Sequence, residues 1–189
     1  MSMKDLIKYV LVSEEEINSI TDTLAEKITE DYKNSEKPLV LLCLLKGSVL
    51  FMSEMMKKIQ LPLETEFMKV SSYNSGTVSS GTINIQLDIS RTDLADTNIL
   101  IIEDIIDSGS TLSKIYDHLR NKGATSIKTC TLLDKPSRRV VDFTPDYVGK
   151  IIPNEFVVGF GLDYDEKLRN LPSIGVLKPE VYSETDVNP

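Results

Sequence analysis

The sequence predicts an α/β protein with a central, mostly parallel sheet and helices on both of its faces. Two continuous apolar runs, at residues 38–45 and 98–106, support this prediction. Strands buried on both faces of a parallel sheet lack the polar alternation of half-exposed strands, so they have such runs. The second observation is the order of segments, in which strands and helices alternate along most of the chain.

The first helix is expected to begin after Ser13, because Ser13 and Glu16 have the spacing of a capping box. Apolar residues then recur at helical spacing, namely Ile17, Ile20, Leu24 and Ile28. The polar segment 34–38 ends this helix and leads into the strand at 38–45. Residues 46–48 break that strand, and residues 49–59 are predicted to form the second helix.

Residues 63–70 and 82–90 are predicted to be two strands that form a hairpin beside the main sheet. In the second strand apolar and polar residues alternate, which indicates that one face is solvated. Residues 71–81 lie between the strands, are mostly small and polar and include glycine, so we expect a mobile loop there.

After the strand at 98–106, a helix is predicted at about 110–121, with Gly123 as its C-terminal cap. Further strands are expected at 126–134, 147–153 and 156–161. The sequence shows no repeat and no linker long enough to divide it. Residues 1–189 are therefore predicted to form one domain, with a core at about 36–140.

Composition excludes several classes of function. The net charge of −8 argues against a general nucleic-acid binder, because there is no basic surplus to neutralise phosphates. Cys43 and Cys130 lie in apolar runs and are expected to be reduced core residues, and one histidine without a CxxC pair does not favour a zinc site. No apolar run reaches the ~18 residues of a membrane span, and no signal sequence is evident. A cytoplasmic protein without a membrane partner is predicted.

The most informative segment is 101–111, IIEDIIDSGST. Glu103, Asp104 and Asp107 lie at the predicted carboxyl end of a parallel strand, where ligands of such sheets bind. Residues 108–111 open the next helix, and their backbone N–H groups and hydroxyls suit a phosphate. The acids would repel a phosphate unless they face hydroxyl groups or Mg²⁺. The segment therefore predicts a sugar-phosphate site. The alternative, solvated acids before an ordinary helix cap, fits an isolated DSGST but not the whole pattern.

Residues 99–112, ILIIEDIIDSGSTL, resemble the phosphoribosyl-pyrophosphate (PRPP) motif of type I phosphoribosyltransferases. Four other stretches resemble segments of the hypoxanthine-guanine phosphoribosyltransferase family: the pyrophosphate loop LLKGS (44–48), the flap SSYNSGT (71–77), and the purine-binding segments LLDKPSRR (132–139) and FVVGFGLDYDEKLRNLP (156–172). The likeness runs in the same order from about residue 10 to 180. The chain thus resembles a bacterial-type member of this family.

This resemblance implies a Mg²⁺-dependent reaction of purine salvage. The 5-phosphoribosyl group of PRPP would be transferred to N9 of hypoxanthine or guanine, giving IMP or GMP and pyrophosphate. It also implies a small hood built from about residues 1–15 and 145–180, and a homodimer or homotetramer.

The resemblance also implies roles for residues that bind PRPP. Glu103 and Asp104 would hold the ribose hydroxyls and Mg²⁺. Asp107 would act as general acid or base near N7 of the purine. The 5′-phosphate would be held by Asp107, Ser108, Gly109, Ser110 and Thr111, and pyrophosphate by Lys46, Gly47 and Arg169. In this family the peptide bond before the lysine matched by Lys46 can be cis.

The purine site implied by the resemblance consists of Lys135, Phe156, Val157 and Asp163. Lys135 would donate to the 6-oxo group, and an ammonium cannot accept from the 6-amino group of adenine. Phe156 would stack on the base, and the backbone of Val157 would bond its Watson–Crick edge. Asp163 would hold a second Mg²⁺ through water.

The flap residues Ser72 and Tyr73 would close over the reacting centre and exclude water. The run Tyr164-Asp165-Glu166 matches no site and receives no role.

Two alternatives remain beside this reading. One is a regulatory protein of the same fold that binds RNA or DNA, which the net charge of −8 disfavours. The other is a type I enzyme for another base, which Lys135, Phe156 and Asp163 disfavour. The preference among hypoxanthine, guanine and xanthine stays open, because backbone atoms read the 2-position of the base.

Overall fold

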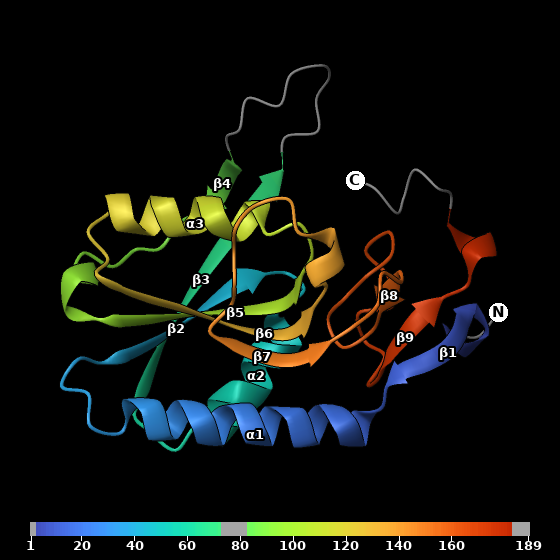
Figure 1. Cartoon of the computed structure of the whole chain (residues 1–189), viewed down its shortest axis with the longest axis horizontal. Coiled ribbons are helices and arrows are strands. Elements are labelled where there is room, and N and C mark those ends of the chain that lie inside the picture. The colour runs from blue at the N-terminus through green and yellow to red at the C-terminus, as the bar shows by residue number, and fades with distance from the viewer. Residues whose placement is uncertain (1–2, 73–82, 183–189) are drawn as a thin grey trace.

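The computed structural model describes residues 3–72 and 83–182, which form two sheets and three α-helices (Figure 1). The strands of the large sheet are β2 (Leu39–Leu45), β3 (Leu63–Ser72), β4 (Ile83–Leu87), β5 (Asn98–Ile106), β6 (Ser126–Asp134) and β7 (Tyr147–Ile151). Those of the small sheet are β1 (Ile7–Val12), β8 (Val157–Val158) and β9 (Ile174–Leu177). The helices are α1 (Glu14–Tyr32), α2 (Val49–Lys58) and α3 (Ser110–Asn121).

The large sheet has the order β4-β3-β2-β5-β6-β7 and is parallel except for β4. β4 runs antiparallel to β3, with Ser72 opposite Ile83, so these strands form the predicted hairpin arms. The predicted fold class, a mostly parallel sheet flanked by helices, is confirmed.

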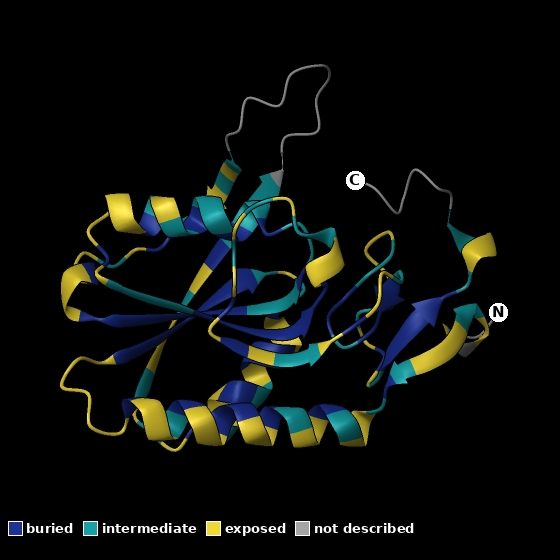
Figure 2. Ribbon diagram, viewed as in Figure 1, coloured by how far each residue is buried: buried dark blue, intermediate teal, exposed yellow. Residues whose placement is uncertain are grey.

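The helices cover both faces of this sheet: α1 and α2 lie on one face and α3 on the other (Figure 1). Strand β5 shows why its sequence is continuously apolar. Leu100 and Ile102 pack in the cluster that includes α1 and α2, while Ile99 and Ile101 pack in the cluster that includes α3. The strands at the centre are therefore buried on both sides (Figure 2).

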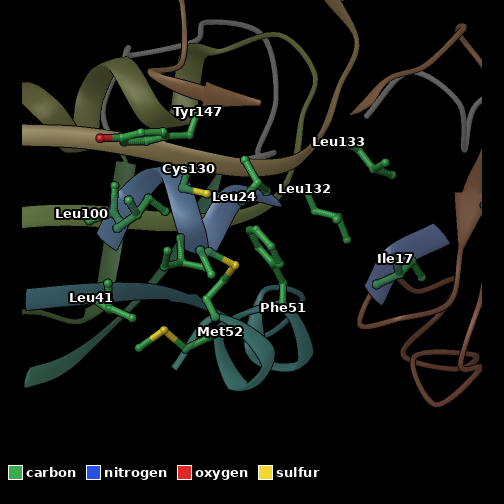
Figure 3. Close-up of a cluster of buried hydrophobic side chains, with 14 of the residues drawn as sticks. Ile17, Leu24, Leu41, Phe51, Met52, Leu100, Cys130, Leu132, Leu133 and Tyr147 are labelled. Carbon is green, nitrogen blue, oxygen red and sulfur yellow. The ribbon is translucent and has the colours of Figure 1, made fainter. Parts of the chain in front are cut away.

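The larger cluster lies between the sheet and the pair α1 and α2. Phe51 and Met52 of α2 point toward Leu100, Cys130 and Tyr147 of the sheet (Figure 3). Cys130 is a free cysteine and is fully buried. Burial raises the pKa of its thiol well above the usual range. It is the reduced core residue that its apolar surroundings in the sequence predict.

Two predicted helix caps are confirmed. The backbone N–H of Glu16 donates to Ser13 Oγ at 3.2 Å at the start of α1. Gly123 follows the end of α3 with φ +100°, a conformation that glycine adopts without strain.

The small antiparallel sheet has the order β1-β9-β8 and differs from the sequence-based expectation. No strand was predicted at β1 or β9. The strand predicted at 156–161 is reduced to Val157–Val158, because Gly159 and Gly161 both adopt φ +99°. Strand β7 pairs with β6, so it belongs to the large sheet and not to a hood that begins near residue 145.

No helix within residues 3–72 and 83–182 combines the length and the apolar character that crossing a membrane requires.

Replacing Phe51 by alanine is expected to lower the free energy of unfolding by about 3–5 kcal/mol, because its side chain is fully buried and would leave a cavity. Leu50, its neighbour in α2, is 36% exposed, and its replacement by alanine should cost less than about 1 kcal/mol. Urea denaturation of both variants measures the difference. Equal losses would contradict the burial of α2 against the sheet.

Candidate functional site

The loop between β5 and α3 forms a small anion-sized hollow at the carboxyl end of the sheet. A cavity of about 120 Å³ is lined by residues of this loop, among them Asp107, Ser108, Gly109 and Thr111. Gly109 is the N-cap of α3 with φ +79°, and a Cβ there would lie 2.9 Å from Cδ of Arg139. The backbone N–H groups that begin α3 therefore line a site suited to a phosphate.

Two arginines after β6 support this loop, and the sequence analysis gave them no role. Arg139 donates to the backbone oxygen of Asp107, to that of Phe143 at 3.0 Å, and forms an ion pair with Asp134. Nε of Arg138 lies 3.1 Å from Oδ1 of Asp107. The signal was present in the sequence, since both arginines belong to the LLDKPSRR segment.

Glu103 and Asp104 are positioned by Ser48, a buried residue at the N-terminus of α2. Ser48 Oγ donates to Glu103 Oε2 at 2.9 Å and accepts from the backbone N–H of Asp104 at 3.1 Å. Burial and then the Asp104 charge raise the pKa of Glu103 well above its usual range. Burial raises the pKa of Asp104 to about 6, against the opposing effect of backbone N–H groups and Arg169. Ser48 was missed as a site residue although it ends the LLKGS segment.

The loop between β2 and α2 lies directly against these acids. The peptide bond between Leu45 and Lys46 is cis. A Cβ at Gly47 would lie 1.8 Å from Oδ2 of Asp104, and a Cβ at Gly161 would lie 1.9 Å from the carbonyl oxygen of Gly47. A Cβ at Gly161 would meet backbone, and one at Gly47 would displace the Asp104 carboxylate, so these glycines allow three chain segments to meet at one point.

The segment 161–169 brings Arg169 to this point. Its Nη1 donates to the Gly161 oxygen at 2.8 Å, and its Nη2 lies 2.9 Å from Oδ1 of Asp163. Glu166 then joins the two cations expected to bind pyrophosphate. Its Oε2 lies 2.8 Å from Nζ of Lys46 and 3.3 Å from Nη2 of Arg169.

The residues expected to bind a purine lie at the end of β6 and the start of β8. Lys135 is buried, and its backbone N–H donates to the oxygen of Ile106 at 2.9 Å. Burial lowers the pKa of the Lys135 ammonium, while the charges of Asp107 and Glu155 oppose this shift. The charges of Asp107 and Glu155 thus both act on Lys135. Glu155 is the residue before Phe156, so the two parts of the expected purine site lie near each other.

Aromatic rings surround Phe156. The ring of Tyr182 stacks on it with a centroid distance of 5.0 Å, and Tyr164 contacts it edge-on at 5.8 Å. One face of the Phe156 ring is therefore covered by Tyr182, and a base would need the other face. Val157 is buried in β8, where it pairs with Val176 of β9.

The three acids expected to hold metal are divided between two places. Among the described residues, no group of three or more histidine, cysteine or acidic side chains could enclose a metal ion. Glu103 and Asp104 are adjacent, whereas Asp163 pairs with Arg169. The charge of Asp163 nevertheless acts on Asp104, whose pKa it helps to raise.

The structure describes only the first part of the expected flap. Ser72 is the last residue of β3. Tyr73 lies outside the described residues.

Comparison with known proteins gives consistent results. Residues 13–165 match the family described as phosphoribosyl transferase domain. A hypoxanthine-guanine phosphoribosyltransferase of Lactococcus lactis is 53% identical over 178 residues, which cover 94% of this chain and 95% of that protein. One from Staphylococcus epidermidis is 50% identical over 96% of this chain and 99% of its own length.

A solved structure shares the fold in detail. The crystal structure of a hypoxanthine phosphoribosyltransferase from Staphylococcus aureus superposes with a TM-score of 0.89 at 49% sequence identity, covering 96% of this chain and 97% of that one. Identity and fold agree over nearly the full length, and the chain belongs to the hypoxanthine-guanine phosphoribosyltransferase family.

Proposed function

We propose that this enzyme transfers the 5-phosphoribosyl group of PRPP to N9 of hypoxanthine or guanine, giving IMP or GMP and pyrophosphate. One observation carries the proposal. The loop of Gly109, the acid pair Glu103 and Asp104, and the buried ammonium of Lys135 lie at the carboxyl ends of neighbouring strands. These three parts match the phosphate, the ribose and the 6-oxopurine of one product nucleotide.

In the reaction, the bond between C1′ and pyrophosphate breaks while the bond between C1′ and N9 forms. The purine gives up a proton as it becomes a nucleotide, and Asp107 receives it near N7. Arg138 lies 3.1 Å from Oδ1 of Asp107, and it holds the carboxylate in a defined orientation. The negative charge of Asp107 also stabilises positive charge that develops on the base and ribose.

Lys135 selects the base. Its ammonium has donors only, so it bonds a 6-oxo group and leaves a 6-amino group without an acceptor. Because Lys135 is buried, water cannot compensate for that mismatch. Adenine is therefore a poor substrate.

The acid pair suits Mg²⁺. Two half-buried carboxylates with raised pKa values favour a cation that would offset their mutual repulsion, and Mg²⁺ prefers oxygen ligands of this kind. Glu103 and Asp104 would hold the ion with the ribose and pyrophosphate oxygens, where it would neutralise charge on the leaving group. Ser48 keeps Glu103 in place through its hydroxyl.

The same proposal covers the organisation of the enzyme. Residues 1–189 act as one catalytic domain, in which Phe156 and Val157 come from the start of β8, beside the large sheet (Figure 1). The enzyme works as a homodimer or homotetramer in the cytoplasm. The two buried cysteines agree with a reducing compartment.

The function is tested by incubating the protein with PRPP, Mg²⁺ and one of four bases: hypoxanthine, guanine, xanthine or adenine. Nucleotide formation is followed by absorbance. Turnover with hypoxanthine or guanine, with kcat/KM for adenine lower by at least about 100-fold, is expected from the Lys135 donor. No turnover with either 6-oxopurine would disprove the proposal.

Replacing Asp107 by asparagine should lower kcat by about 10²–10⁴-fold, because the amide cannot accept the purine proton. The KM for PRPP should change much less, since the phosphate loop keeps its backbone donors. Steady-state kinetics measure both quantities. Asp117, an exposed acid of α3, provides the control, and its replacement by asparagine should leave kcat unchanged. An Asp107 variant with normal kcat would refute the assigned role.

Replacing Asp104 by asparagine should stabilise the metal-free protein while abolishing most turnover. The pKa of Asp104 is about 6 in the folded chain and lower when unfolded, so its ionisation weakens folding as pH rises from about 4 to 6. Above this window the variant should be more stable by about 1–3 kcal/mol. Near pH 4 the gain should vanish. Urea denaturation at both pH values is the measurement, and a variant less stable at pH 7.5 would contradict the account.

A further inference from the structure

Glu166 holds a position that the proposed reaction leaves unexplained. Its carboxylate stands between Lys46 of the β2–α2 loop and Arg169, two cations from distant parts of the chain. Hydrogen bonds from Lys46 and then Arg169 lower the pKa of Glu166, so it is a carboxylate at neutral pH. An internal anion thus occupies the donors proposed to bind pyrophosphate.

This contact is easy to break. The side chains of Lys46 and Glu166 are 51% and 65% exposed, and ion pairs in such surroundings contribute little because water and salt screen them. Arg169 has further partners in Gly161 and Asp163, so its guanidinium stays in place when Glu166 leaves. The cations therefore remain ready for another anion.

Only the side chain of Glu166 needs to move. The backbone of the loop is fixed at this residue, because its N–H donates to Oδ2 of Asp163 at 2.9 Å. Its φ of +62° gives the loop a tight local turn. From this anchored backbone, rotation of the three side-chain torsions carries the carboxylate into solvent.

We propose that Glu166 competes with pyrophosphate for Lys46 and Arg169, and that its return to these cations speeds pyrophosphate release. Glu166 occupies donors of both cations and neutralises part of their charge, and its carboxylate would repel the multiply charged pyrophosphate beside it. This inference rests on the proposed function, because pyrophosphate is the leaving group of that reaction.

The test compares Glu166→Gln with Asp165→Asn. The neighbouring Asp165 also has a positive φ, of 51°, and its carboxylate pairs with Lys167 at 2.8 Å. Each change removes one negative charge from the same loop and keeps the side-chain size, but only the first frees Lys46 and Arg169. The variants are titrated with pyrophosphate in the presence of Mg²⁺ by calorimetry, and product inhibition by pyrophosphate is measured.

For Glu166→Gln, the Kd and the inhibition constant of pyrophosphate should fall by about three- to tenfold, as expected for two exposed ion pairs lost from the free enzyme. The KM for PRPP should fall with them, while the KM for the purine should stay unchanged. Asp165→Asn should bind pyrophosphate as the wild type does.

Unchanged or weaker pyrophosphate binding by Glu166→Gln would overturn the inference, because weaker binding is what a purely structural role for Glu166 predicts. An equal gain in Asp165→Asn would also overturn it, since the effect would then come from overall charge. Wild-type turnover separates the two levels. If the wild type is active and Glu166→Gln binds pyrophosphate as the wild type does, only this inference is disproved. If the wild type is inactive, the proposed function is disproved.

Discussion

The site depends on the close approach of three chain segments around Gly47. Its position leaves no space for a Cβ beside Asp104, and Gly161 in turn leaves no space beside the Gly47 carbonyl. A side chain at Gly161 would push its segment away from the β2–α2 loop, whereas one at Gly47 would displace the carboxylate of Asp104 from its present position. The two glycines thereby let the backbone that carries Lys46 approach Asp104 and the segment that contains Gly161. The phosphate loop depends on a second glycine contact, that of Gly109 with Arg139.

The two acids beside Gly47 lower the stability of the protein when no ligand is bound. Burial raises the pKa values of Glu103 and Asp104, and the charge of Asp104 adds to the shift of Glu103, so keeping both ionised weakens the fold. Ser48 and Arg169 offset part of this cost, because the Ser48 hydroxyl donates to Glu103 and the charge of Arg169 acts to lower the pKa of Asp104. Such arrangements are common where a protein gives up stability to prepare a binding site.

The sequence predicted the large sheet well and the small sheet poorly, for physical reasons. The strand at 98–106 and the helix at 110–121 match the observed bounds of β5 and α3, because apolar runs and caps are local signals. β1 and β9 are short, and their pairing joins the two ends of the chain, which no local pattern encodes. The motif residues of the site were predicted through resemblance. Ser48, Arg138 and Glu166 were not, because their roles are contacts with residues far away in sequence.

The burial of the two thiols has a practical consequence for labelling. The chain contains only Cys43 and Cys130, both buried, and burial raises the pKa of the Cys43 thiol to about 12. Neither forms an appreciable thiolate at neutral pH, and the thiolate is the species that reacts with maleimides and related reagents. The two natural cysteines therefore do not react with such labels in the folded protein. A single cysteine introduced on the surface becomes the sole attachment point for a fluorophore or spin label, without removal of the natural ones.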